Sequence, residues 1–257
     1  MKHPIPTRRL LIILFWTAIW QIASMVIQND IIFAGPADVV RSFFTLLPTP
    51  AFWQSIGHSF AKISIGFCSA FVCGILIGSL AFRFRLIAEF LDPVMMLIKS
   101  VPVASFVILA LIWIGSANLS VFISFLVVLP ILYVNTITGL QSTDRKLLEM
   151  AQVFSVRLPG RIRFIYLPAL FPYLTGGCKV ALGMSWKSGI AAEVIGVPAL
   201  TIGENLYLSK IYLATADLFA WTIVIILVST VFEAVFLNLL QLLVRRSAYE
   251  TIPTDHS

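Results

Sequence analysis

Three lysine side chains lie inside long apolar stretches of the sequence, where a charge is costly. Lys179 and Lys187 fall in a stretch at 169–192, and Lys99 falls in a stretch at 93–114. An ionisable group within a membrane span costs about 2.5–3.5 kcal/mol and usually marks a functional site. Cationic groups at such depth would attract an anionic solute, so Lys179, Lys187 and Lys99 are candidates for lining a translocation path. The stem of Lys99 is also long enough to carry its ammonium group to the membrane surface.

The chemistry of a conventional enzyme or metal site is missing from the sequence. Cys68, Cys73 and Cys178 stand in apolar stretches without a CxxC spacing. The sequence contains no H-E-x-x-H, G-x-S-x-G or G-x-x-x-x-G-K-[ST] motif. We therefore predict no catalytic, cofactor or metal site in this chain, and ATP hydrolysis would have to take place on another polypeptide. These absences also disfavour an intramembrane enzyme.

The composition predicts the elements that hold these lysines. Of the 257 residues, 59% are hydrophobic and only 12% are charged, and the mean hydropathy is +0.97. An ordinary soluble domain has about 25% charged residues, so a soluble globular protein and a disordered chain are both excluded. Six apolar stretches have the length of about 20 residues that crosses a bilayer, which predicts an all-α polytopic membrane protein. These stretches are 10–27, 61–82, 93–114, 119–138, 169–192 and 218–243.

The basic residues predict the orientation of the six spans. If the spans alternate, twelve Lys and Arg residues fall on one side and three on the other, so the positive-inside rule puts both termini in the cytoplasm. The twelve are Lys2, Arg8, Arg9, Arg83, Arg85, Arg145, Lys146, Arg157, Arg161, Arg163, Arg245 and Arg246, and the three are Arg41, Lys62 and Lys210. The net charge of +6 is thus a topology signal, and no nucleic acid partner is needed to explain it. The first span lacks a cleavage site and is expected to be retained.

The cytoplasmic loop 139–168 carries five of these basic residues and predicts a short amphipathic helix. Ser142 or Thr143 can cap this helix, and Asp144 falls in its first turn. Leu147, Ala151 and Phe154 share one face by their spacing, and Pro159-Gly160 is expected to end the helix. The loop is either a solvated segment with an interfacial helix or a rigid element that transmits force from a cytoplasmic motor.

The loop resembles the EAA loop of ABC importer permeases, whose pattern is Glu-Ala-Ala, three residues, Gly, nine residues, Ile, one residue, Leu-Pro. The matching residues are Glu149, Ala151, Ile165, Leu167 and Pro168, and the spacing agrees throughout. Met150 replaces the first Ala of the pattern and Ser155 replaces its Gly. Ser155 is small enough to keep a close approach, but a turn with positive φ is not expected of a serine.

The resemblance covers about residues 35–215 and is strongest to the permeases of nitrate, sulfonate, taurine and bicarbonate importers. The segments that carry it outside the loop are FAGPADVVRSF, LDPVMMLIKSVPVASFVILALIWIG and TGGCKVALGMSWKSGIAAEVIG. It implies a type I importer permease with six transmembrane helices in the cell inner membrane. The implied partners are a second permease subunit, in the simplest case a copy of this chain, two cytoplasmic ATPase subunits that bind ATP and Mg, and an external substrate-binding protein. The residues implied in ATPase coupling are Glu149, Ala151, Ser155, Leu167 and Pro168.

This interpretation divides the chain into three parts: an N-terminal span with an external amphipathic segment (1–60), a permease core (61–243) and a cytoplasmic tail (244–257). The expected solute is small and anionic, such as a sulfonate, nitrate or taurine. A neutral or zwitterionic metabolite, such as a pyrimidine or an amino acid, is the alternative. An ATP-independent carrier or channel is the alternative function, although the sequence has no internal repeat of the kind that many carriers show.

Small residues and prolines predict how the spans are shaped. Gly74 and Gly78 form a G-x-x-x-G pair in the second span, which is typical of close helix packing. Pro102 and Pro130 interrupt helical hydrogen bonding within the third and fourth spans.

Overall fold

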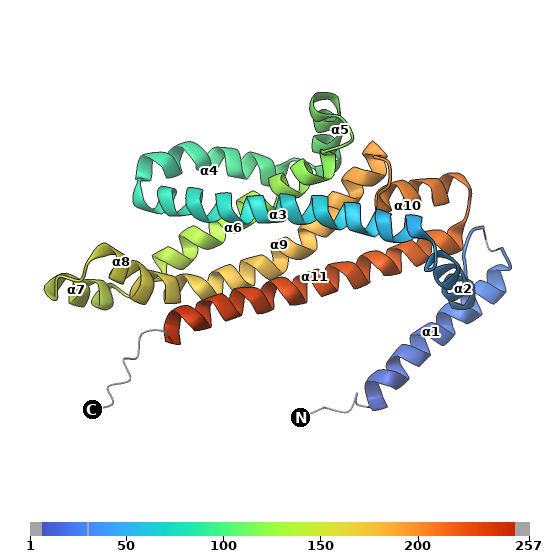
Figure 1. The fold of residues 1–257 in the computed structure, drawn as a ribbon, viewed down its shortest axis with the longest axis horizontal. Helices are drawn as coiled ribbons and strands as arrows, with labels where there is room; N and C mark the ends of the chain where they lie inside the picture. Colours follow the sequence, from blue (N-terminus) through green and yellow to red (C-terminus); the bar gives the residue numbers. More distant parts are fainter. Residues whose placement is uncertain (1–6, 30, 250–257) are drawn as a thin grey trace. The chain divides into compact units, whose positions relative to one another are not determined.

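The computed structural model describes residues 7–29 and 31–249, and the side chains of 10–29 and 31–242 (Figure 1). Every regular element in these ranges is a helix. The helices are α1 (Thr7–Ile27), α2 (Pro36–Leu46), α3 (Pro50–Arg83), α4 (Arg85–Ser100), α5 (Val103–Ile114), α6 (Leu119–Gln141), α7 (Arg145–Val153), α8 (Leu158–Arg161), the π-helix η1 (Ile162–Tyr166), α9 (Leu167–Gly196), α10 (Ile202–Ile211) and α11 (Thr215–Tyr249).

Five helical segments are long and apolar enough to cross a membrane: Leu10–Ile27, Pro50–Arg83, Leu119–Gln141, Leu158–Gly196 and Thr215–Leu242. They overlap five of the six predicted spans, and two of them, Pro50–Arg83 and Leu158–Gly196, begin eleven residues earlier than predicted. Of the predicted tail, residues 244–249 continue α11 and residues 250–257 lie outside the described residues. Lys2 and the side chains of Arg8, Arg9, Arg245 and Arg246, which support the predicted orientation, also lie outside them.

The third predicted span is a bent pair of helices. After Phe84, α4 turns back along α3, and α5 then leaves at 104° to α4 (Figure 1). The break falls at Val101 and Pro102. Proline has no N–H, and the residue before it is pushed out of the helical region, as the ψ of 131° at Val101 shows. By contrast, Pro130 stands inside the continuous helix α6, so only one of the two predicted interruptions divides a span.

The chain divides into two compact units, and each is described by itself. The first comprises residues 1–59 and 197–227. Within it, the predicted amphipathic segment forms α2, which begins with Pro36 in its first turn. Val39 packs with Ala220 in a buried cluster, and Ser42 Oγ donates a hydrogen bond to Asp217 Oδ1 at 2.5 Å. Polar and apolar contacts together join α2 to the start of α11.

The second unit comprises residues 60–196 and 228–257, and its centre is α6. Two glycines of α3 let the backbones approach closely: a Cβ added at Gly74 would lie 2.8 Å from Leu132 Cβ, and one at Gly78 would lie 2.8 Å from Thr136 Cβ. On α9, a Cβ at Gly177 would lie 2.7 Å from Asn135. The prediction that Gly74 and Gly78 pack helices closely is confirmed, and both contacts are with α6.

A matched pair of alanine substitutions tests this packing. Gly78→Ala places a methyl group against Thr136 and should cost about 1–3 kcal/mol through overpacking. Gly57→Ala, on an open surface of the same helix, should gain up to about 1 kcal/mol from helix propensity. We expect Gly78→Ala to lower the thermal unfolding midpoint of the detergent-solubilised protein and Gly57→Ala to preserve or raise it. Equal midpoints for the two variants would contradict close packing at Gly78.

Candidate functional site

The predicted coupling loop lies between α6 and α9, where α7 and α8 extend beyond the ends of these two long helices (Figure 1). Asp144 is the N-cap of α7, since its carboxylate accepts a hydrogen bond from the Lys146 N–H at 2.9 Å. The expectation that Ser142 or Thr143 caps this helix is wrong. The Thr143 hydroxyl instead donates to the Leu140 carbonyl at 2.8 Å, at the end of α6.

The C-terminus of α7 is closed by a Schellman turn around Ser155. The Val156 N–H donates to the Ala151 carbonyl at 2.8 Å, and the Ser155 N–H donates to the Gln152 carbonyl at 3.1 Å. This turn needs a left-handed residue, and Ser155 adopts φ +51°. The loop therefore keeps the positive φ that was not expected of a serine. Pro159 does not end the helix as predicted, because α7 stops at Val153 and Pro159 stands in the first turn of α8.

Arg161 ties this turn to the next helix. Its Nε donates to the Val156 carbonyl at 2.8 Å, and its Nη2 lies 3.5 Å from the Ala151 carbonyl. The guanidinium thus binds carbonyls at the end of α7, where the helix dipole favours a positive charge. The sequence pattern did not single out Arg161, because its partners are main-chain atoms.

The residues of α7 differ in how far they are exposed. Ala151 is only 1% exposed and is buried within its own chain, so it does not present a surface to a partner. Glu149 and Ser155 are exposed. The apolar residues that face outward are Leu147, Met150, Val153 and Phe154, of which Val153 is 80% exposed and Phe154 is 75% exposed. We call these four residues the α7 apolar face. It includes Met150, one of the two departures from the family pattern.

The last part of the motif joins the loop to α9. Ile165 is buried in the π-helix η1, and Leu167 and Pro168 form the first turn of α9 without a break in the helical path. Tyr166 packs edge-on against Phe82 of α3, with ring centroids 6.1 Å apart. A π-helix carries an extra residue per turn and often occurs at functional positions. Ile165, Leu167 and Pro168 therefore lie on one continuous helical path from α8 into the apolar helix α9.

The three intramembrane lysines lie on two different helices. Lys179 and Lys187 are both exposed and stand eight residues apart on one side of α9, at a spacing that returns to the same helix face. Gly176 and Gly183 share this side, and a Cβ added at either would meet no atom within 4 Å. Lys99 is exposed in the last turn of α4. The structure therefore places Lys179 and Lys187 on one side of α9 and Lys99 on another helix, α4.

Comparison with known proteins agrees with this architecture. A family described as the binding-protein-dependent transport system inner membrane component matches residues 70–249. The chain belongs to this family. The permease is 27% identical over 238 residues to a putative aliphatic sulfonates transport permease of Bacillus subtilis, covering 91% of this chain and 85% of the relative. It is 23% identical to a taurine transport permease of Escherichia coli, with 84% and 81% covered.

A third relative, a nitrate import permease of Synechococcus elongatus, is 26% identical over 189 residues, covering 69% of this chain and 67% of the relative. These similarities identify an ABC importer permease of the nitrate, sulfonate, taurine and bicarbonate type. The permease is accordingly a multi-pass protein of the inner membrane.

The left-handed turn can be tested at Ser155. Ser155→Gly removes the Cβ from a conformation that costs an L-residue about 1–2 kcal/mol, so we expect stronger protection of the Val156 amide in hydrogen exchange. Gln152→Gly, inside α7, should instead weaken protection, since glycine costs a helix interior about 1 kcal/mol. If the two glycine variants changed the protection in the same direction, the assignment of the turn would be wrong.

Proposed function

We propose that the permease carries a small anionic solute across the inner membrane. An external binding protein delivers the solute, and a separate ATPase drives transport through the loop between α6 and α9. The observation that carries this proposal is the α7 apolar face. Three large apolar side chains stand outward on a nine-residue helix and a fourth, Phe154, follows at its C-cap. An exposed apolar patch of this kind marks an interaction site. Its occupant is the ATPase subunit, with Phe154 and Val153 as the most exposed anchors.

Hydrogen bonds close both ends of α7, so the loop can transmit force as a rigid element. Asp144 caps the start, and the Schellman turn with Arg161 closes the end. Motion of a docked ATPase therefore moves α7 and α8 together and passes into α9. Two permease subunits would bring two such loops together when the ATPase dimer closes on ATP. The bundle would open to the outside in that state and to the cytoplasm after hydrolysis. In this proposal both termini of the permease lie in the cytoplasm.

Phe154→Asp tests the docking role. A central aromatic anchor contributes about 2 kcal/mol or more to an interface, so we expect at least a tenfold loss of co-purified ATPase and of ATP-driven uptake in proteoliposomes. Phe154 is 75% exposed, so the thermal midpoint of the isolated permease should not change. Gln152→Asp is the matched control, because it adds the same charge to the polar side of α7. Normal ATPase binding and uptake by Phe154→Asp would contradict this docking site.

An Ala151→Trp variant would not test the contact between the α7 apolar face and the ATPase by itself. Ala151 is buried in its own chain, so a bulky side chain there would disturb the loop before any partner bound. The exposed residues of the α7 apolar face are the informative positions.

The side of α9 that carries Lys179 and Lys187 is the proposed wall of the path. It combines two ammonium groups with two glycines that have open space beside them. In a pair of permease subunits, the two walls would face each other and four positive charges would surround the solute. This arrangement favours a sulfonate, nitrate or similar anion over a neutral metabolite.

Lysine substitutions test the wall. An ion pair at 4 Å is worth about 1–4 kcal/mol at aqueous to interfacial dielectric constants. We therefore expect Lys179→Met with Lys187→Met to lower ATP-driven uptake of taurine, ethanesulfonate or nitrate by about tenfold or more. Lys210→Met, in the last turn of α10, is the control and should leave uptake unchanged. If the variant with both substitutions kept full uptake and the same solute preference, these lysines would not line the path.

A further inference from the structure

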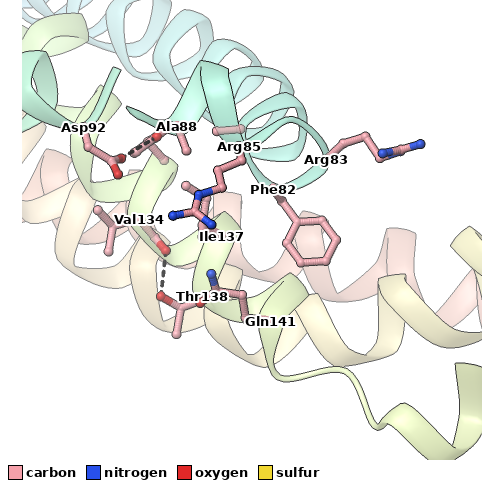
Figure 2. A pocket seen from close by; sticks show the side chains of 11 residues that line it. Phe82, Arg83, Arg85, Ala88, Asp92, Val134, Ile137, Thr138 and Gln141 are labelled. Atoms are coloured by element: carbon pink, nitrogen blue, oxygen red, sulfur yellow. Dashed lines mark hydrogen bonds between the residues drawn. The ribbon is translucent and has the colours of Figure 1, made fainter. Parts of the chain in front are cut away.

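A cavity of about 410 Å³ lies between the start of α4 and the C-terminal half of α6, within the second unit. Its lining combines charged and polar groups with apolar walls, and it shares no residue with the α7 apolar face or with the lysines of α9. Figure 2 shows the Arg85 side chain pointing into the cavity above Thr138 and Gln141, whereas the Arg83 side chain points away. Asp92 lies at the other end of the cavity.

The Asp92 end of the cavity is anionic and preorganised. Asp92 Oδ1 accepts a hydrogen bond of 2.7 Å from the hydroxyl of Tyr133, a residue only 1% exposed. This contact fixes one carboxylate oxygen and leaves the other available. Asp92 is exposed, and its other carboxylate oxygen has no hydrogen-bond partner among the described residues. A bound ammonium group would supply that partner.

The Arg85 end of the cavity is cationic. Arg85 Nε donates to Glu89 Oε1 at 2.9 Å, and these side chains are 92% and 65% exposed. This exposed pair uses one of the five guanidinium N–H groups, so four donors remain. Guanidinium donors match the oxygens of a phosphate or sulfonate. Gln141 adds an amide that makes no hydrogen bond with the described part of the chain.

The two ends are separated by seven residues of α4, about 10 Å along the helix axis. We propose that the cavity binds a zwitterionic group in which an ammonium is joined to a tetrahedral oxyanion by two carbons. The ammonium would pair with Asp92 and the oxyanion with Arg85, while Phe82 and Val134 would contact the carbon linker. Two sources share this chemistry, the headgroup of phosphatidylethanolamine and a free 2-aminoalkyl sulfonate such as taurine. This inference concerns binding to the permease alone, so it stands or falls separately from ATP-driven transport.

Binding is measured with full-length permease in phosphatidylglycerol nanodiscs, with taurine and ethanesulfonate as calorimetric probes. A parallel arm uses nanodiscs of mixed phosphatidylethanolamine and phosphatidylglycerol and counts retained lipids by native mass spectrometry. Loss of one charged hydrogen-bond partner corresponds to about tenfold weaker binding or more. Asp92→Asn should therefore weaken binding of taurine or phosphatidylethanolamine and spare ethanesulfonate, which has no ammonium. Arg85→Gln should weaken binding of both taurine and ethanesulfonate, and of the lipid.

Three further variants separate this site from a general charge effect. Glu89→Gln should not weaken binding, since it removes the competing partner of Arg85. Lys210→Gln, in the last turn of α10 and outside the cavity, should have no effect. Tyr133→Phe keeps the Asp92 charge but frees its orientation, so it should weaken only the ligands that carry an ammonium. Thermal midpoints of all variants show whether each is folded.

The two arms identify the source of the ligand. Saturable taurine binding that depends on Asp92 and Arg85 assigns the cavity to a soluble zwitterion. Selective retention of phosphatidylethanolamine with the same dependence assigns it to the lipid. The proposal is overturned if neither ligand binds saturably, or if folded Asp92→Asn and Arg85→Gln variants bind both ligands like the wild type.

Discussion

The second unit depends on direct backbone contact between helices. Gly74 and Gly78 of α3 and Gly177 of α9 each remove a side chain where the helix meets α6. In a bilayer, lipid chains are as apolar as the helix surfaces, so helices associate through close packing of this kind more than through hydrophobic burial. Because α6 and α9 are held together along their length, the short helices between them start from fixed positions.

The loop keeps the geometry of its family while changing some of the residues that make it. Ser155 adopts the left-handed conformation that glycine adopts more easily, and the turn is held by main-chain hydrogen bonds and by Arg161. Met150 stands on the exposed side of α7, where a longer side chain adds contact area without disturbing the fold. Ser155 thus keeps the geometry of the turn, and Met150 enlarges the exposed apolar surface of α7.

Sequence periodicity and composition predicted the long helices, the amphipathic helix α2 and the place of the loop, because these follow from local apolar patterns. The same reasoning failed where structure depends on contacts between distant residues. Tyr133 and Asp92 are 41 positions apart, so no sequence motif predicts their hydrogen bond. Leu147, Ala151 and Phe154 share one face by their spacing, yet Ala151 is buried while Leu147 and Phe154 are exposed. Pro102 predicts an interruption of the helix, but its local effect does not determine the angle of 104° between α4 and α5.

The break between α4 and α5 changes the electrostatic field at this depth of the bundle. Where α4 ends, the last carbonyl groups present the negative end of a helix dipole, and α5 begins beside it with its positive end. Lys99 stands in the last turn of α4, the end at which the dipole of its own helix favours a cation. Because α4 ends at this break, Lys99 stands at a helix C-terminus, which an unbroken span would not provide at this position.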